Sequence, residues 1–187
     1  MVSVKGLEVL IEACAEAATR IDFRLYLVGN GPLYSKLQRR SVELGIEGRV
    51  TFAGYVPHAD LPDWYRAADL MVLPSHSEGI PNVLLESIAS GTPFVASRVG
   101  GIPEIADPLL DRLVAPADVG ALADAIVDSL AAPSRIDRRT MPISSATDAA
   151  ERLLDVLASA VRGSRPVPSM NGAPVSARGG DAVRAQP

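Results

Sequence analysis

Short apolar segments alternate with amphipathic stretches along the first 132 residues. Segments such as 24–28 and 69–73 are followed by glycine or proline, which is typical of strands buried on both faces of a parallel sheet. The predicted strands lie near 24–28, 49–53, 69–73, 93–97 and 112–115, and the predicted helices near 6–19, 32–44, 60–67, 81–90, 102–106 and 118–131. This alternation predicts an α/β fold with a doubly wound, Rossmann-like parallel sheet.

Local signals mark the helix ends. Asp118 is a predicted N-cap, because its side chain can accept a bond from the first turn of the next helix. Pro81 and Pro103 fit the first turns of two other helices, where a missing N–H costs little. Gly91 is the predicted stop of the helix that begins near Pro81.

The pattern weakens after residue 132. Residues 133–145 are predicted to form a loop, and 147–161 a closing helix, so 133–161 is treated as one segment. The stretch 162–187 is rich in Gly, Pro, Ser, Ala and Arg without apolar periodicity, which predicts a disordered tail.

Composition excludes several classes of protein. A chain of 187 residues with 48% hydrophobic and 21% charged residues is ordinary for an α/β domain. A net charge of −4 and 4% aromatic residues disfavour a nucleic-acid partner. No apolar run reaches 18 residues, so no transmembrane segment is expected. Cys14 falls at helical spacing with Leu10 and Ile11, which predicts a core position, and a single cysteine suits a reducing, cytoplasmic compartment.

Three strands run into glycine- or proline-containing turns, at 29–32, 75–81 and 99–103. Such turns at the carboxyl ends of parallel strands can approach phosphates. The first turn, with Gly29 and Gly31, begins like a dinucleotide fingerprint, but Tyr34 stands where the third glycine belongs. A nicotinamide or flavin site is therefore disfavoured.

Glu78 and Glu86 stand eight residues apart across a predicted helix start. The backbone N–H groups between them and the helix dipole attract an anion, while Glu86 can accept bonds from a vicinal diol. A nucleoside diphosphate-sugar offers both groups. The alternative is that Glu86 is a solvated helix residue and Glu78 only complements the helix dipole. The candidate backbone row is Gly79, Ile80, Pro81, Asn82, Val83 and Leu84, in which Pro81 has no N–H to donate.

Metal-site signals are weak in this sequence. The chain has no Asp-x-Asp, its two histidines are isolated, and its single cysteine cannot build a site. His58 and His76 are interpreted as loop hydrogen-bonding residues rather than catalysts. A lysine, a helix N-terminus and oriented amides can stabilise a diphosphate without metal. The sequence therefore predicts no cofactor and no metal ion.

Several blocks in this order resemble the donor-binding half of a family-4, GT-B-type retaining glycosyltransferase, within the glycosyl transferases group 1. The resemblance covers roughly residues 2–132, and its most specific element is the pair of glutamates with a seven-residue spacer. The blocks are Lys5-Gly6, 28–32, 52–57, Glu78 to Glu86, and Gly91-Thr92-Pro93 through Glu104. It implies that residues 1–132 form a nucleotide-sugar-binding, Rossmann-like domain.

The resemblance also implies roles for single positions. Glu86 would hold the ribose hydroxyls, Glu78 would lie beside the transferred sugar, and Lys5 would neutralise the donor diphosphate. Lys5 and Glu78 thus form the expected catalytic set. The backbone from Gly79 to Leu84 would contact sugar hydroxyls and phosphate, and the region of Tyr55 and Val56 would receive the base. Gly29 and Gly31 complete the expected donor-binding set, and transfer would proceed with retention and without a metal.

The chain departs from the family at its start. Residues 1–4 are only a stub of the first strand, which is central in the family's sheet, and an arginine five residues before the lysine would precede Met1. The acceptor-binding domain lies upstream in the family. The expectation is therefore a fragment whose full-length form transfers a sugar to a sugar or lipid-linked acceptor, peripherally at the inner membrane face. The alternatives are a non-catalytic nucleotide-sugar-binding subunit and a GT-B-type sugar epimerase.

Overall fold

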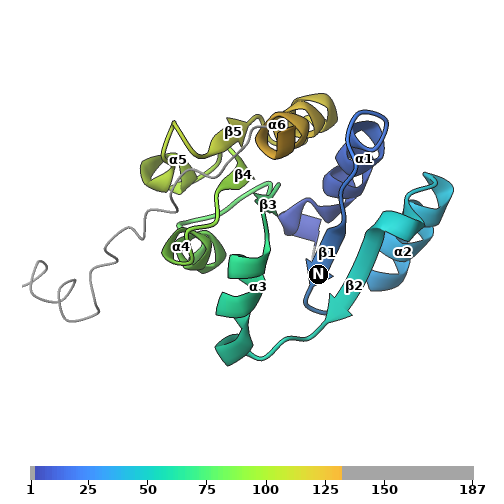
Figure 1. Cartoon of the computed structure of the whole chain (residues 1–187), viewed down its shortest axis with the longest axis horizontal. Coiled ribbons are helices and arrows are strands. Elements are labelled where there is room, and N and C mark those ends of the chain that lie inside the picture. The colour runs from blue at the N-terminus through green and yellow to red at the C-terminus, as the bar shows by residue number, and fades with distance from the viewer. Residues whose placement is uncertain (1–2, 132–187) are drawn as a thin grey trace, which may run out of the picture. The chain divides into compact units, whose positions relative to one another are not determined.

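Helices and strands alternate along the part of the chain that the computed structural model describes, residues 3–131 (Figure 1). The strands are β1 (Leu25–Val28), β2 (Val50–Gly54), β3 (Met71–Leu73), β4 (Phe94–Ser97) and β5 (Arg112–Val114). The helices are α1 (Leu7–Ala17), α2 (Tyr34–Glu43), α3 (Leu61–Ala67), α4 (Asn82–Ala89), α5 (Ile102–Ile105) and α6 (Val119–Ala131). Short 3₁₀ helices, which were not predicted, span Ser3–Lys5, Glu47–Arg49 and His58–Asp60. Each predicted helix and strand in this range is confirmed.

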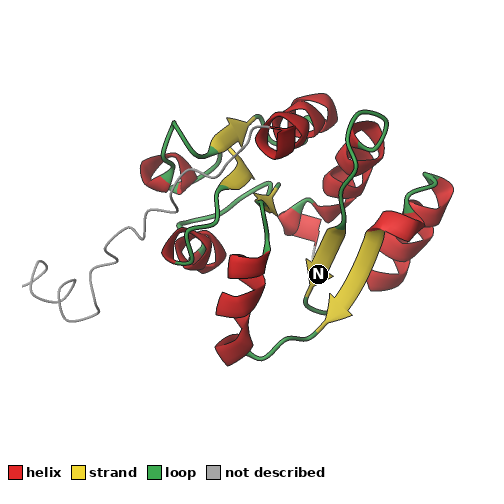
Figure 2. Ribbon diagram, in the orientation of Figure 1, coloured by secondary structure: helices red, strands yellow, loops and turns green. Residues whose placement is uncertain are grey.

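All strand pairs are parallel, as the alternation predicted. β1 pairs with β2, and β4 lies between β3 and β5. Within residues 3–131 no ladder joins β1 to β3, so the expected single sheet is divided into two (Figure 2).

One apolar core spans both sheets. It contains Leu27 from β1 and Val95 from β4, and α1 covers them while packing against α2 and α6. The buried face of α1 follows the 3.6-residue period and consists of Leu10, Ile11, Ala13, Cys14 and Ala17. The predicted core position of Cys14 is confirmed, and burial raises the pKa of its thiol to about 12. Side-chain packing therefore connects the two sheets where backbone pairing does not.

A second apolar cluster lies between the three-stranded sheet and the helices α4 and α5. Its buried members are Leu73, Leu84, Phe94, Ala96 and Ile102. Phe94 is fully buried, and its backbone N–H donates to the carboxylate of Asp111, 2.9 Å away. This cluster fixes the helix α4, which carries Glu86, against the end of β3.

The predicted helix ends are also observed, with one shift. Asp118 Oδ1 accepts a bond of 2.9 Å from the Ala121 N–H, which confirms it as the N-cap of α6. Gly91 has φ +72° and its N–H donates to Ile88 O, so it ends α4 as predicted. Pro81 has φ −78° and ψ 124° and precedes the first residue of α4. The helix thus begins one residue later than expected.

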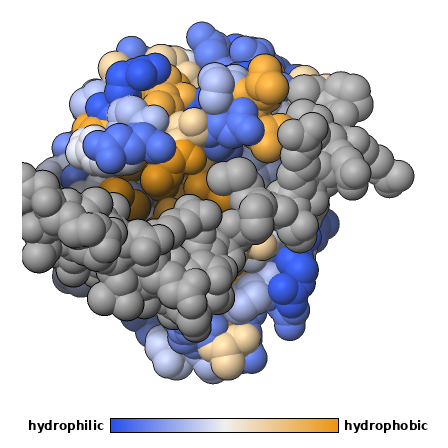
Figure 3. Space-filling model, turned by 90° about the vertical axis from the view of Figure 1, so that its left-hand side faces the viewer, coloured by the Kyte–Doolittle hydropathy of each residue, from blue (hydrophilic) through white to orange (hydrophobic). Residues whose placement is uncertain are grey.

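The surface carries exposed apolar side chains near the loop between β3 and α4, residues 74–81, which is called the donor loop below because it holds Glu78. On the face in Figure 3, hydrophobic residues gather in a patch bordered by hydrophilic ones. Exposed large apolar side chains include Ile80 in the loop before α4 and Leu85 within that helix. None of the helices between residues 3 and 131 is long and apolar enough to cross a membrane. The predicted segments 133–161 and 162–187 lie outside the described residues.

Candidate functional site

The loops at the carboxyl ends of β1 and β2 are tied together by their backbones. The Gly29 N–H donates to Gly54 O at 2.6 Å, and Gly29 has φ +109°, a backbone conformation that favours glycine. Gly31 O accepts a bond from the Tyr34 N–H at the start of α2. Tyr55 and Val56 follow β2, with Tyr55 exposed and Val56 half-buried. The predicted glycine turn and base-binding segment therefore lie at the carboxyl ends of neighbouring strands.

The start of the described chain lies beside the loop that follows β3. Val4 O accepts a bond of 2.8 Å from the His76 N–H. Gly6 has φ +63°, and a Cβ there would come within 1.9 Å of Pro74 O, so only glycine allows this approach. These contacts fix Lys5 at the start of α1 next to the predicted donor loop.

Lys5 and Glu78 form an ion pair in which Nζ lies 2.6 Å from Oε1. The Glu78 side chain is 12% exposed, and that of Lys5 is 38% exposed. Burial opposes ionisation of Glu78, but the Lys5 ammonium and the Ser75 hydroxyl outweigh it, so the pKa of Glu78 lies below its usual value. The two residues predicted to be catalytic are thus brought together, with the carboxylate ionised.

Ser75 is the polar group buried most deeply beside this pair. Its side chain is fully buried, and its Oγ makes no hydrogen bond of normal geometry to the described residues. It nevertheless favours the charged form of Glu78. Sequence reasoning did not single it out.

The backbone row between the glutamates is only partly open. Gly79, Ile80 and Asn82 are exposed, whereas Leu84 is fully buried in the second apolar cluster. The Leu84 N–H already donates to Pro81 O at 3.0 Å. Leu84 therefore serves the core, and the groups accessible to a ligand lie before it.

The turn 99–103, which follows β4, packs against the loop that contains Glu78 and Gly79. The Gly101 N–H donates to Gly79 O at 2.9 Å, and a Cβ on Gly100, whose φ is +53°, would meet Glu78 O at 1.8 Å. The glycines of the 99–103 turn thus allow close backbone packing against the donor loop. This close packing restricts the backbone position of Glu78.

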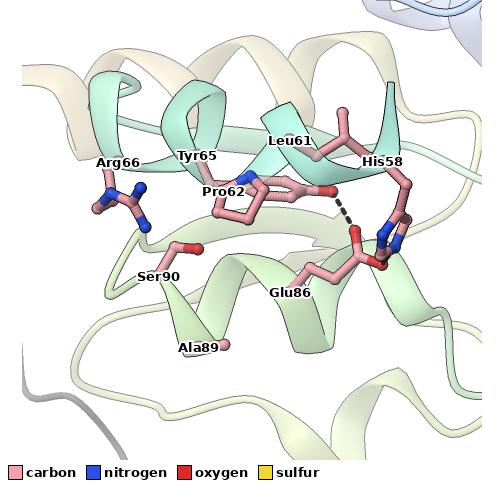
Figure 4. Close-up of a pocket in the computed structure, with 8 residues that line it drawn as sticks. All are labelled: His58, Leu61, Pro62, Tyr65, Arg66, Glu86, Ala89 and Ser90. Carbon is pink, nitrogen blue, oxygen red and sulfur yellow. Dashed lines mark hydrogen bonds and ion pairs between the residues drawn. The ribbon is translucent and has the colours of Figure 1, made fainter. Parts of the chain in front are cut away.

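Glu86 occupies a different environment, between α3 and α4. The Tyr65 hydroxyl donates to its Oε2 at 2.9 Å, and His58 Nε2 lies 3.2 Å from its Oε1 (Figure 4). Glu86 is neither a freely solvated helix residue nor fully buried, since its side chain is 29% exposed. His58 thus makes a hydrogen-bonding contact, although it lies in the 3₁₀ helix His58–Asp60 and not in the loop expected from the sequence.

Glu86 also lines a cavity of about 230 Å³. The other lining residues are His58, Leu61, Pro62, Tyr65, Arg66, Ala89 and Ser90. Figure 4 shows Tyr65 and His58 reaching Glu86 from the α3 side. Burial raises the pKa of Tyr65, and its bond to Glu86 and that residue's charge add to the shift, so its hydroxyl stays a donor at neutral pH. Tyr65 was not identified from the sequence, because only packing of α3 on α4 brings it to Glu86.

No group of three or more His, Cys, Asp or Glu side chains within residues 3–131 is arranged to hold a metal ion. The side chains that gather at the two sites are mainly a lysine, carboxylates and hydroxyls. Such groups suit a ligand that carries negative charge at one end and hydroxyls at the other.

This chain is similar in sequence to known proteins over much of its length. Residues 1–132 match the glycosyl transferases group 1 family. A GDP-mannose-dependent alpha-(1-6)-phosphatidylinositol monomannoside mannosyltransferase of Mycolicibacterium smegmatis is 37% identical over 144 residues, which is 72% of this chain and 38% of that protein. The N-acetyl-alpha-D-glucosaminyl L-malate synthase of Bacillus anthracis is 38% identical over 102 residues, or 54% of this chain and 26% of that one.

A solved structure gives the same result for the fold. The sucrose-phosphate synthase of Thermosynechococcus elongatus superposes with a TM-score of 0.72 and 30% identity, covering 87% of this chain and 44% of that one. Like the mannosyltransferase and the N-acetyl-alpha-D-glucosaminyl L-malate synthase, it is much longer than the region it shares with this chain. The predicted GT-B architecture is therefore confirmed for the shared part.

Proposed function

This chain belongs to the glycosyl transferases group 1 family, and we propose that it binds a nucleoside diphosphate-sugar and acts in transferring the sugar, with retention at the anomeric carbon. The observation that carries the proposal is the Lys5–Glu78 ion pair of 2.6 Å beside the N-terminus of α4. It supplies a cation and a carboxylate within reach of one ligand. Lys5 would contact the diphosphate, and Glu78 would lie beside the transferred sugar.

The chemistry of transfer explains why these groups suffice. The bond between the anomeric carbon and the diphosphate oxygen breaks, and its electron pair leaves with the diphosphate. A new bond forms to an acceptor oxygen, and the proton of its hydroxyl passes to the departing diphosphate. Negative charge grows on the leaving group, where the Lys5 ammonium and the N–H groups at the start of α4 can stabilise it. We therefore propose a metal-independent reaction.

Glu86 is proposed to bind the ribose. Its carboxylate is partly exposed at the edge of a cavity and can accept bonds from a vicinal diol. Tyr55 and Val56, which follow β2, are proposed to contact the base, and Gly29 and Gly31 to complete the donor site. The donor thus extends from the ribose at Glu86 to the sugar at Glu78.

The relatives support the donor class. One is named for its dependence on GDP-mannose, and another as an N-acetylglucosaminyl transfer enzyme by its product. This chain spans 38% and 26% of those two proteins. Acceptor binding, to a sugar or a lipid-linked acceptor, is therefore proposed to belong to a separate domain. A cytoplasmic location at the inner membrane face is part of the same proposal.

Calorimetric titration tests the donor site directly. The full chain would be titrated with UDP-glucose, GDP-mannose and ADP-glucose, each with and without a chelator. We expect saturable binding of at least one donor, unchanged by the chelator. Lys5→Met should lower the affinity for that donor and for the matching nucleoside diphosphate, but should leave the affinity for the free nucleoside unchanged.

Lys36→Met is the matched control, because Lys36 is another ion-paired lysine, bound to Glu8 on the surface. It should bind the donor like the wild type. Absence of binding for all three donors would contradict the proposal. Conversion of a bound sugar to its epimer without acceptor would point to an epimerase instead.

A further inference from the structure

Three hydroxyl hydrogen bonds, two of them buried and the third partly buried, connect the turn before β4 with Glu86. Ser87 Oγ donates to Thr92 O at 2.9 Å, and Thr92 Oγ1 donates to Tyr65 O at 2.6 Å. Tyr65 Oη then donates to Glu86 Oε2 at 2.9 Å. Ser87 and Thr92 are 0% and 2% exposed, so the first two bonds are shielded from competing water. The series begins and ends on α4 and passes through α3.

This arrangement treats the two oxygens of Glu86 differently. Oε2 receives a hydrogen bond from a tyrosine whose backbone is itself anchored by Thr92. Among residues 3–131, the contact made by Oε1 is with His58 Nε2 at 3.2 Å, and the His58 side chain is 85% exposed. A bond to a buried, anchored donor holds one rotamer, whereas a contact with an exposed ring is easily exchanged for another partner. Oε1 is therefore the oxygen available to a ligand.

We propose that Tyr65, anchored by Thr92, is a positioning residue that holds Glu86 so that Oε1 accepts bonds from a ribose diol, and that His58 occupies Oε1 until the nucleotide displaces it. This inference rests on the proposed function, in which Glu86 binds ribose. It adds a residue from another helix that prepares the carboxylate for its ligand. It also assigns a task to the threonine of the Gly91-Thr92-Pro93 turn.

The charged groups near Glu86 are consistent with this assignment. Arg66 lines the same cavity but forms an ion pair with Asp63 on its own helix. The groups that contact the carboxylate within the described residues are thus one buried phenol and one exposed imidazole. A neutral, fixed donor orients a carboxylate without cancelling the charge that attracts hydroxyl protons.

The test compares nucleotides that differ only in the ribose. UDP, GDP and ADP, and the 2′,3′-dideoxy form of whichever binds best, would be titrated into the full chain and its Tyr65→Phe variant. We expect the variant to bind the ribonucleotide about 5- to 20-fold more weakly and the dideoxynucleotide equally well. Equal losses of affinity for the ribonucleotide and the dideoxynucleotide would indicate a general loss of structure and would overturn the proposal. Unchanged affinity for both nucleotides would also overturn it.

Further variants keep the test independent of folding defects. Thr92→Val should reproduce the diol-specific loss of affinity. Thr92→Ser retains the hydroxyl and should bind the ribonucleotide like the wild type. Tyr26→Phe is the matched control, because this exposed tyrosine on β1 packs against the Trp64 ring and does not bond to Glu86 among the described residues. His58→Ala should bind the ribonucleotide as tightly as the wild type or up to about 3-fold more tightly. A loss in His58→Ala as large as in Tyr65→Phe would overturn the displacement step.

The outcomes also separate this inference from the function it rests on. If the wild type binds no nucleotide, the proposed function fails and the inference falls with it. If the wild type prefers ribonucleotides and Tyr65→Phe keeps the full preference, only the inference fails.

Discussion

The Lys5 ammonium lies 2.6 Å from the Glu78 carboxylate, although 73 residues separate them in the chain. The pair joins the start of α1 to the loop before α4. Lys5 is held there by the Val4–His76 backbone bond, and Glu78 by the packing of Gly100. Both partners are therefore positioned by neighbouring backbone rather than by their mutual attraction alone.

Removing this cation should lower stability at neutral pH. Lys5→Met leaves Glu78, which is 12% exposed, without its charged partner. Because Lys5 itself is 38% exposed, solvent screens part of the interaction, and we expect a loss of about 1 kcal/mol in the free energy of unfolding. Denaturant titration at pH 7 measures it, with the surface variant Lys36→Met losing less than about 0.5 kcal/mol. Equal losses in Lys5→Met and Lys36→Met would show that the Lys5–Glu78 pair stabilises the fold no more than an exposed surface pair.

The same pair predicts a dependence of stability on pH. The pKa of Glu78 is lowered in the folded state. A carboxyl group of this kind stabilises the fold above its unfolded pKa, about 4.3, and the contribution disappears as pH falls through the lower folded value. The stability difference between wild type and Lys5→Met should thus be full above the unfolded pKa and shrink as the pH falls below it. A difference that stays constant over this range would contradict the assigned ionisation.

Glu86 is predicted to matter for binding more than for folding. Its side chain is 29% exposed and lines the cavity, so Glu86→Gln should keep the fold while weakening the cognate nucleotide by about 1.5–3 kcal/mol, the range for hydrogen bonds to charged groups. Calorimetry with the nucleoside diphosphate measures this loss. Glu43→Gln, an exposed surface partner of Arg40, is the control and should bind normally. Unchanged affinity in Glu86→Gln would remove Glu86 from the donor site.

Gly100 is predicted to be irreplaceable for a backbone reason. Its φ is +53°, and an added Cβ would lie 1.8 Å from Glu78 O. The left-handed conformation alone costs about 1–2 kcal/mol for alanine, and the clash must push the donor loop away. Gly100→Ala should therefore lose at least about 2 kcal/mol of stability and bind donor more weakly. Gly48→Ala is the control, since nothing lies within 4 Å of its Cβ position; equal stability of the two variants would contradict the argument.

The elements that the sequence predicted correctly are those with strong local signals. The apolar period of α1, the Asp118 cap and the Gly91 stop depend on neighbouring residues, so they can be recognised without knowing the fold. The family resemblance placed Lys5 and Glu78 in one donor site, but their direct contact was not predicted, because nothing local connects residues so far apart.

Other features could not be predicted because they depend on packing between elements. Tyr65 reaches Glu86 only when α3 lies against α4, and the Thr92 hydroxyl finds Tyr65 O across 27 residues. Leu84 falls within a ligand-binding row by sequence, yet its side chain points into the core. Helical position decides this, since a shift of one residue turns a side chain by about 100°.

The divided sheet leads to a last prediction, about stability and association. β1 pairs only with β2, and β3 only with β4, so within residues 3–131 two strand edges lack a ladder partner where the sheets meet. Unpaired edges lose backbone hydrogen bonds and attract other strands. We expect the chain to unfold below about 60 °C or to associate, measured by calorimetry and sedimentation. Val28→Lys, at an exposed position on β1, should reduce association, whereas Val42→Lys, at an exposed position on α2, should not. A sharp monomeric transition above about 60 °C would show that the shared core around Leu27 and Val95 is enough to hold the two sheets together.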